Sequence, residues 1–132
     1  SSVQATWNLL EQSAAPALIT AHKMGLGIII KEALANGRLT SRNISPDFRS
    51  SMRILEAQAE AIQITIDALA LAAVMQQLFV DVTLSGAAHI DHLESNLKAL
   101  GVVWDDALEN LLEKLLESPE VYWHKRSQMA WN

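Results

Sequence analysis

The feature that most constrains the fold is a short apolar run at residues 26–30, which stands between two helical patterns. The side chains of Ile28, Ile29 and Ile30 would point to both faces of an extended chain. Continuous apolar runs of this length are typical of parallel strands that are covered on both faces. Residues 3–10 contain valine, threonine and tryptophan and carry a second strand pattern. The first third of the chain therefore predicts a strand, a helix and a strand.

The helix between these two strands has recognisable ends. Pro16 falls in its first turn, where a missing N–H costs little, and Gly25 lies just past its last turn. We expect the side chain of Ser13 to cap the first turn. After the second strand, residues 35–43 form a loop by composition.

The second half of the chain repeats the alternation. A helical region begins at Ser45-Pro46-Asp47 and runs to about residue 78, with a break near Thr65, which can cap its second piece. Residues 79–86 predict a third strand, and the helix after it ends at Gly101. A last helix carries leucines on one stripe: Leu108, Leu111, Leu112, Leu115 and Leu116.

Alternating strands and helices predict an α/β fold with a parallel sheet, which is either open or closed into a barrel. Three strands do not close a barrel, and an open three-stranded sheet would expose unpaired backbone groups at both edges. We therefore expect one partial domain over residues 1–132, with strand and helix units in 1–101 and a C-terminal helix and tail in 102–132. Its expected partner is a missing part of the sheet or a second copy of the chain.

Composition excludes several classes of function. Fifteen acidic residues against ten basic ones give a net charge of −5, so no basic surface is expected to bind nucleic acid. The chain has no cysteine, which excludes disulfides and thiolate metal sites. Its apolar runs are broken too often to span a membrane, and its first residues do not resemble a signal peptide. A cytoplasmic protein is expected.

The sharpest local motif lies at the end of the third predicted strand, directly before a helix, and consists of Ser85, Gly86, Ala87 and Ala88. Backbone N–H groups and the positive end of the helix dipole point out of such a turn, and a glycine lets a phosphate approach the main chain. The same residues also suit a tight turn that binds nothing. Taken alone, the motif leaves both interpretations open.

Longer stretches of the chain resemble the aldo/keto reductase family. Residues 85–88, SGAA, followed by residues 92–100, HLESNLKAL, are similar to the end of that family's last barrel strand and the next helix. Residues 25–40, GLGIIIKEALANGRLT, are similar to its preceding strand and loop, and residues 3–12, VQATWNLLEQ, to the strand before that. The aromatic and basic tail at 122–132 resembles one bacterial and plant branch of the family.

This resemblance implies that the chain is the C-terminal part of a (β/α)8 TIM barrel, with its active site at the carboxyl ends of the strands. It also implies hydride transfer between NADP or NAD and a small carbonyl or sugar substrate. The family's aspartate, tyrosine, lysine and histidine, which polarise the carbonyl and relay its proton, lie on earlier strands. No catalytic residue is therefore assigned to this chain. The alternative function is a non-catalytic α/β module for assembly or interaction.

The resemblance assigns part of the nicotinamide site to two strand residues. Gln4 matches a glutamine that hydrogen-bonds the nicotinamide carboxamide, although a polar strand residue can equally contact a neighbouring strand or water. Lys31 stands where the family often stacks an aromatic ring on the nicotinamide. A cation at this position would instead approach a cofactor phosphate or the substrate.

The resemblance assigns the adenosine side of the cofactor to the third strand and the next helix. The turn that holds the adenosine phosphate matches Gly86, Ala87 and Ala88, with Ser85 before them. Asn96 matches an asparagine that bonds the adenine, and Ser95 lies beside it. His92 stands where many NADP-dependent members have an arginine for the 2′-phosphate, and Glu94 is close by, so both NADP and NAD are candidate cofactors.

Two other groups of residues could be mistaken for sites. His89 and His92 are spaced one helical turn apart, but no third ligand is evident, so we expect a surface pair and no metal site. Glu109, Glu113 and Glu117 recur at four-residue steps, which predicts a solvated helix face.

Overall fold

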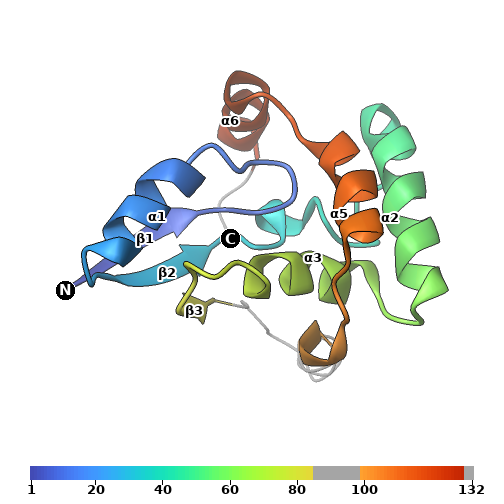
Figure 1. Ribbon diagram of the computed structural model, residues 1–132. Coiled ribbons are helices and arrows are strands. Elements are labelled where there is room, and N and C mark those ends of the chain that lie inside the picture. Colours follow the sequence, from blue (N-terminus) through green and yellow to red (C-terminus); the bar gives the residue numbers. More distant parts are fainter. Residues whose placement is uncertain (85–98, 130–132) are drawn as a thin grey trace.

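The computed structural model describes residues 1–84 and 99–129 (Figure 1). Its three strands form one parallel sheet in the order β1-β2-β3. The strands are β1 (Ser2–Thr6), β2 (Gly27–Lys31) and β3 (Val82–Thr83). Because Thr6 pairs with Lys31, the carboxyl ends of β1 and β2 lie side by side. The predicted α/β fold with three parallel strands is confirmed.

Helices separate the strands, as parallel connections require. Between β1 and β2 lies α1 (Ala15–Lys23). Between β2 and β3 lie the short 3-10 helices η1 (Ala35–Gly37) and η2 (Pro46–Phe48), then α2 (Arg49–Ala61) and α3 (Ile66–Met75). After β3 the described elements are η3 (Ala99–Gly101), α5 (Asp106–Leu112), η4 (Glu113–Leu115) and α6 (Pro119–Ser127).

The predicted helix ends are confirmed in two cases and wrong in one. Gly25 follows α1 with a φ of +87°, a left-handed conformation that glycine adopts without strain. Thr65 caps α3, and its hydroxyl oxygen accepts a hydrogen bond from the N–H of Ala68 at 3.3 Å. Ser13 does not cap α1. Its own N–H instead donates to the Glu11 carboxylate at 2.8 Å, which makes Glu11 the acceptor before this helix.

Helix α3 lies at the centre of the core, and nearly all of its residues are buried. In Figure 1 it lies between the sheet and the pair formed by α2 and α5. On one side it packs with the buried side chains of Ile28 and Ile30 from β2 and Leu18 from α1. On the other side it packs with Leu55 of α2 and Leu112 of α5. This central position explains why its sequence is apolar on every side.

The sheet is covered on one face only by the described elements. Ile28 and Ile30 are 0% exposed, whereas Val82 on the opposite face is 49% exposed. The sequence predicts that β2 is covered on both faces, and the described elements cover one of them. Both α1 and α3 pack against the side that carries Ile28 and Ile30. We call the other side the open face, and its exposed or half-buried residues include Gln4, Ile29, Lys31 and Val82.

The last leucine-rich helix is shorter than its sequence predicts. Helix α5 ends at Leu112 and a 3-10 turn follows, so the rotation per residue changes within the leucine stripe. Leu108, Leu112 and Leu115 are buried, whereas Leu111 is only half-buried and Leu116 is 45% exposed. The stripe predicted for all five leucines is thus correct for three.

Within the part of the chain that the structure describes, no single helix is long and apolar enough to cross a membrane. One bent pair, Pro46–Ala61 with Ile66–Met75, reaches that length and composition only when both helices are counted across an 85° bend.

Candidate functional site

Two of the predicted cofactor residues lie on the open face. Gln4 pairs with Ile29, and Lys31 is the last residue of β2, opposite Thr6. Alternate residues of a strand share a face, so the parallel register places the exposed side chains of Gln4 and Lys31 on the same side of neighbouring strands. The structure therefore brings these two residues to one surface of the sheet, with Gln4 in the middle of β1 and Lys31 at the carboxyl end of β2.

The remaining predicted cofactor residues lie outside the described residues, and they are Ser85, Gly86, Ala87, Ala88, His92, Ser95 and Asn96. The described chain reaches this stretch at Leu84, whose N–H donates to the carbonyl of Ile30 at 2.9 Å. We call residues 85–88, which follow Leu84 in the sequence, the cradle segment.

Glu32, the residue after β2, connects the end of β1, the loop after β1 and helix α6 at the carboxyl end of the sheet. Its carboxylate accepts a hydrogen bond from the Thr6 hydroxyl at 3.1 Å and from Arg126 Nε of α6 at 2.5 Å. Its backbone carbonyl accepts a hydrogen bond from Asn8 Nδ2 at 2.9 Å. Glu32 has a φ of +56°, in the left-handed region that few residues other than glycine adopt. The contacts of its side chain and main chain hold it in this conformation.

Asn8 is the buried centre of this arrangement. Its side-chain oxygen accepts the N–H groups of Leu10 and Glu11, which turns the chain just after Thr6 and explains why β1 ends there and does not continue to residue 10 as predicted. Its Nδ2 group also donates to the hydroxyl oxygen of Tyr122 at 3.1 Å. We call the connected residues the polar cluster, and they are Thr6, Asn8, Glu32, Tyr122 and Arg126.

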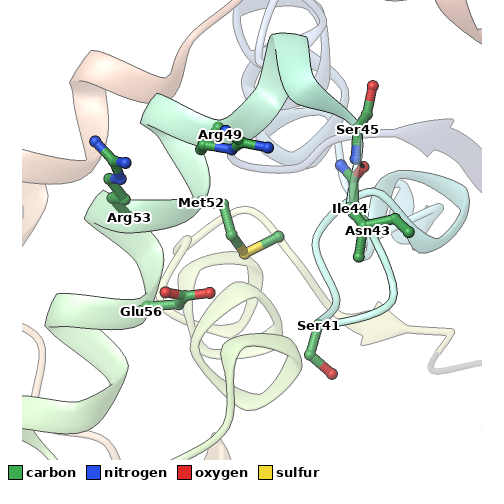
Figure 2. A pocket seen from close by; sticks show the side chains of 8 residues that line it. All are labelled: Ser41, Asn43, Ile44, Ser45, Arg49, Met52, Arg53 and Glu56. Carbon is green, nitrogen blue, oxygen red and sulfur yellow. Dashed lines mark hydrogen bonds between the residues drawn. The ribbon is translucent and has the colours of Figure 1, made fainter.

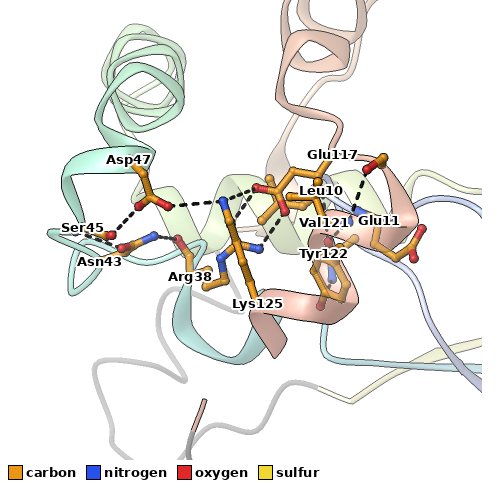
Figure 3. Close-up of polar contacts among 12 residues, drawn as sticks. Leu10, Glu11, Arg38, Asn43, Ser45, Asp47, Glu117, Val121, Tyr122 and Lys125 are labelled. Atoms are coloured by element: carbon orange, nitrogen blue, oxygen red, sulfur yellow. Dashed lines mark hydrogen bonds and ion pairs between the residues drawn. The ribbon is translucent and has the colours of Figure 1, made fainter. Parts of the chain in front are cut away.

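A second group of charged residues fixes α6 further along the same side (Figure 3). Both Nη atoms of Arg38 donate to the carboxylate of Glu117, at 2.9 and 2.6 Å. Lys125 Nζ lies 3.6 Å from the same carboxylate and 3.4 Å from that of Asp47. Glu117 therefore does not belong to a solvated ladder with Glu109 and Glu113, as the spacing predicts, because α5 ends before it and the chain turns toward Arg38.

Helix α6 is therefore attached to the ends of β1 and β2 mainly by polar side chains. Trp123 Nε1 adds a hydrogen bond of 2.6 Å to the carboxylate of Glu11, and the ring of Tyr122 is buried in the core. These contacts form a fixed, hydrogen-bonded border at the carboxyl ends of β1 and β2, next to Lys31.

Within residues 1–84 and 99–129 no group of three or more histidine, aspartate or glutamate side chains could hold a metal ion, and His89 and His92 lie outside these ranges.

We expect Tyr122 to titrate well above an ordinary tyrosine. Burial raises the pKa of its phenol to about 12, compared with about 10 for an exposed tyrosine. Because folding raises this pKa, its contribution to stability is complete below about pH 10 and is lost as the pH rises toward 12. Tyr122 is the only tyrosine in the chain, so the ultraviolet absorbance of phenolate reports it directly. A native midpoint near that of the urea-unfolded chain would contradict this assignment.

Sequence reasoning missed the polar cluster almost completely. Asn8 is a polar residue within the otherwise apolar stretch from Trp7 to Leu10, and this was the one local signal available. Arg38 falls in a stretch that reads as a solvated loop, yet it is buried. Glu32 follows an apolar strand with nothing to indicate a left-handed backbone.

Comparisons with known proteins agree with this architecture. Residues 1–117 match the model of the aldo/keto reductase family. A solved structure of a thermostable aldo-keto reductase in complex with the inhibitor epalrestat aligns with a TM-score of 0.67 at 23% identity, covering 85% of this chain and 38% of that chain. The glycerol dehydrogenase from Gluconobacter oxydans aligns with a TM-score of 0.72 at 21% identity, covering 86% of this chain and 41% of that chain. The chain thus spans about two fifths of the length of these structures. No curated protein matches it.

Proposed function

Because the chain belongs to the aldo/keto reductase family, we propose that it supplies the adenosine-phosphate side and part of the nicotinamide side of an NADP or NAD site. The family match over residues 1–117 carries this proposal, since it includes Gln4, Lys31 and the cradle segment. The reaction is hydride transfer to or from a small carbonyl or sugar substrate. The groups that polarise the carbonyl and relay its proton come from another part of the barrel.

The described residues of the open face suit this assignment. The Gln4 side chain is exposed and offers both a donor and an acceptor, which is what a carboxamide needs from its partner. Lys31 is exposed on the same face, where its ammonium group can bind a phosphate or a substrate oxygen. When bound, the cofactor supplies the hydride. Gln4 orients the nicotinamide amide, and the border formed by the polar cluster fixes the strand end that carries Lys31.

The same proposal gives the open face a place in a larger fold. In a (β/α)8 barrel, these three strands would be the last ones and the open face would line the interior. The edges of β1 and β3 would then pair with further strands, which removes the exposed backbone groups of an open sheet. We propose that the rest of the barrel, or a second copy of the chain, covers this face. The cytoplasmic location stays a prediction.

The chain on its own is expected to show no oxidoreductase turnover, because transition-state stabilisation needs a proton donor and its supporting charges. The test is an assay of the pure chain with NADPH and with NADH, using small aldehydes as substrates. Activity that follows the chain through every purification step would contradict the proposal. The mass of the purified particle separates the two candidate functions: a co-purifying segment with further strands favours the enzyme, and a stable particle of this chain alone favours the non-catalytic module.

A further inference from the structure

A pocket of about 310 Å³ lies between the loop after η1 and the first turns of α2 (Figure 2). Its walls are formed by residues of two segments: Ser41, Asn43, Ile44 and Ser45 from the loop, and Arg49, Met52, Arg53 and Glu56 from the helix. Its volume falls within the range of small-molecule sites. The pocket follows the carboxyl end of β2 along the chain, and none of its lining residues belongs to the sites predicted from the sequence.

The pocket contains two arginines that the described structure leaves without an anionic partner. Arg49 and Arg53 are exposed and four residues apart, so their side chains leave α2 on the same face. Among the described residues, neither guanidinium forms an ion pair or a hydrogen bond, in contrast to the paired Arg38. Glu56 is the one carboxylate in the lining, so the pocket carries a net positive charge.

This local charge contrasts with the chain as a whole. The protein has a net charge of −5, yet three of its ten basic residues, Arg42, Arg49 and Arg53, fall within residues 41–56. An unpaired guanidinium is suited to phosphate and carboxylate groups because its N–H donors form a planar fork that matches two oxygens. Arg49 and Arg53 both line one pocket of an acidic protein, and Figure 2 shows the Arg49 side chain directed toward the loop and Arg53 at the outer rim, an arrangement that favours an anionic ligand at the mouth of the pocket.

The other lining residues define what else such a ligand contacts. Asn43 and Ser45 already use their side chains within the loop, since Asn43 Nδ2 donates to the carbonyl of Arg38 and the Ser45 hydroxyl bonds to Asp47. The lining also includes two apolar side chains, Ile44 from the loop, which is 86% exposed, and Met52 from the helix, which is buried. The lining thus combines two cationic side chains, two apolar side chains and the carboxylate of Glu56, which can accept a hydrogen bond from a ligand hydroxyl.

We infer that this pocket binds the phosphate group of a small organic ligand, through Arg49 and Arg53, with the organic part against Ile44. The phosphate could belong to a phosphorylated sugar or to the adenosine part of a dinucleotide, and both sources share the same chemistry. The inference does not depend on the cradle segment, because it rests on residues of a different loop and helix.

The test is calorimetric titration of the full chain with inorganic phosphate, compared with Arg49→Gln, Arg53→Gln and Lys114→Gln. Each arginine variant should weaken binding by roughly tenfold to a hundredfold, because each removes a charge-assisted contact. Lys114 is an exposed lysine on η4 that does not line the pocket, so its variant makes the same change in net charge and should bind as the parent does. Equal binding by the parent and both arginine variants would overturn the inference, as would an equal loss in Lys114→Gln.

Glucose 6-phosphate and 2′,5′-ADP then distinguish the two sources. If the pocket serves a phosphorylated substrate, Arg49→Gln should weaken binding of glucose 6-phosphate and leave binding of 2′,5′-ADP unchanged. If it serves the cofactor, Arg49→Gln should weaken binding of 2′,5′-ADP and leave binding of glucose 6-phosphate unchanged. Both arginine side chains are exposed, so the variants should fold, and circular dichroism checks this.

Discussion

Gly86→Val is expected to nearly abolish binding of the adenosine phosphate, while leaving the fold of the described core unchanged. In the proposed function the phosphate contacts the main chain of the cradle segment, and the isopropyl group that valine adds would occupy the space it needs. Isothermal titration with ADP measures the loss. Gly101→Val is the matched control, because a Cβ at Gly101 meets nothing within 4 Å. Undiminished ADP binding by Gly86→Val would show that the cradle segment is only a structural turn.

Two further substitutions in the same region should have smaller and different effects. Asn96→Ala removes one proposed adenine contact, which costs about 0.5–1.5 kcal/mol, or up to roughly tenfold in affinity. His92→Arg should shift preference toward NADP, because a guanidinium can fork onto the 2′-phosphate whereas imidazole is mostly neutral at pH 7. Parallel titrations with ADP and 2′,5′-ADP separate these effects, and unchanged selectivity in His92→Arg would place the 2′-phosphate elsewhere.

Glu117→Gln is expected to lower the free energy of unfolding by about 3–5 kcal/mol, because it leaves the Arg38 guanidinium without its counter-charge. The side chains of Arg38 and Glu117 are only 10% and 14% exposed, so water replaces little of the lost interaction. The guanidinium also lies 5.5 Å from the centre of the Phe48 ring and 5.8 Å from that of Tyr122, which keeps it in place as an unpaired cation.

Urea unfolding of three variants tests this expectation. The double variant Arg38→Met with Glu117→Leu should recover most of the loss, because replacing both charges by apolar groups removes the buried cation as well. Glu113→Gln, an exposed position on the same segment, should change stability by less than about 0.5 kcal/mol. A loss below about 1 kcal/mol in Glu117→Gln would mean that the pair behaves like an exposed salt bridge.

The sequence predicts the elements whose signals are local. The position of α3 follows from Thr65 and the apolar residues after it, and the end of α1 follows from Gly25. The three parallel strands follow from the alternation of apolar runs and helices. Each of these signals depends on residues within one or two helical turns, which is why a single sequence is enough to read them.

The polar cluster at the border of the candidate site could not be predicted from local sequence signals, because its contacts join distant parts of the chain. Asn8 meets Tyr122 across 114 positions, and Glu32 meets Arg126 across 94. Such contacts leave no periodic pattern in the sequence. The Ser13 cap fails for a related reason, since the Glu11 carboxylate takes the Ser13 N–H and holds Trp123 as well.

The central claim is that this chain carries the adenosine side of the cofactor site, and hydrogen exchange with ADP tests it most directly on the chain itself. We expect ADP to slow exchange of the backbone amides in residues 85–96, and the same measurement on Arg49→Gln shows whether the arginine pocket contributes to ADP binding. Amides of β1 and α3 serve as internal references and should not change. Saturating ADP that leaves residues 85–96 unprotected, or protects only residues outside them, would contradict the claim.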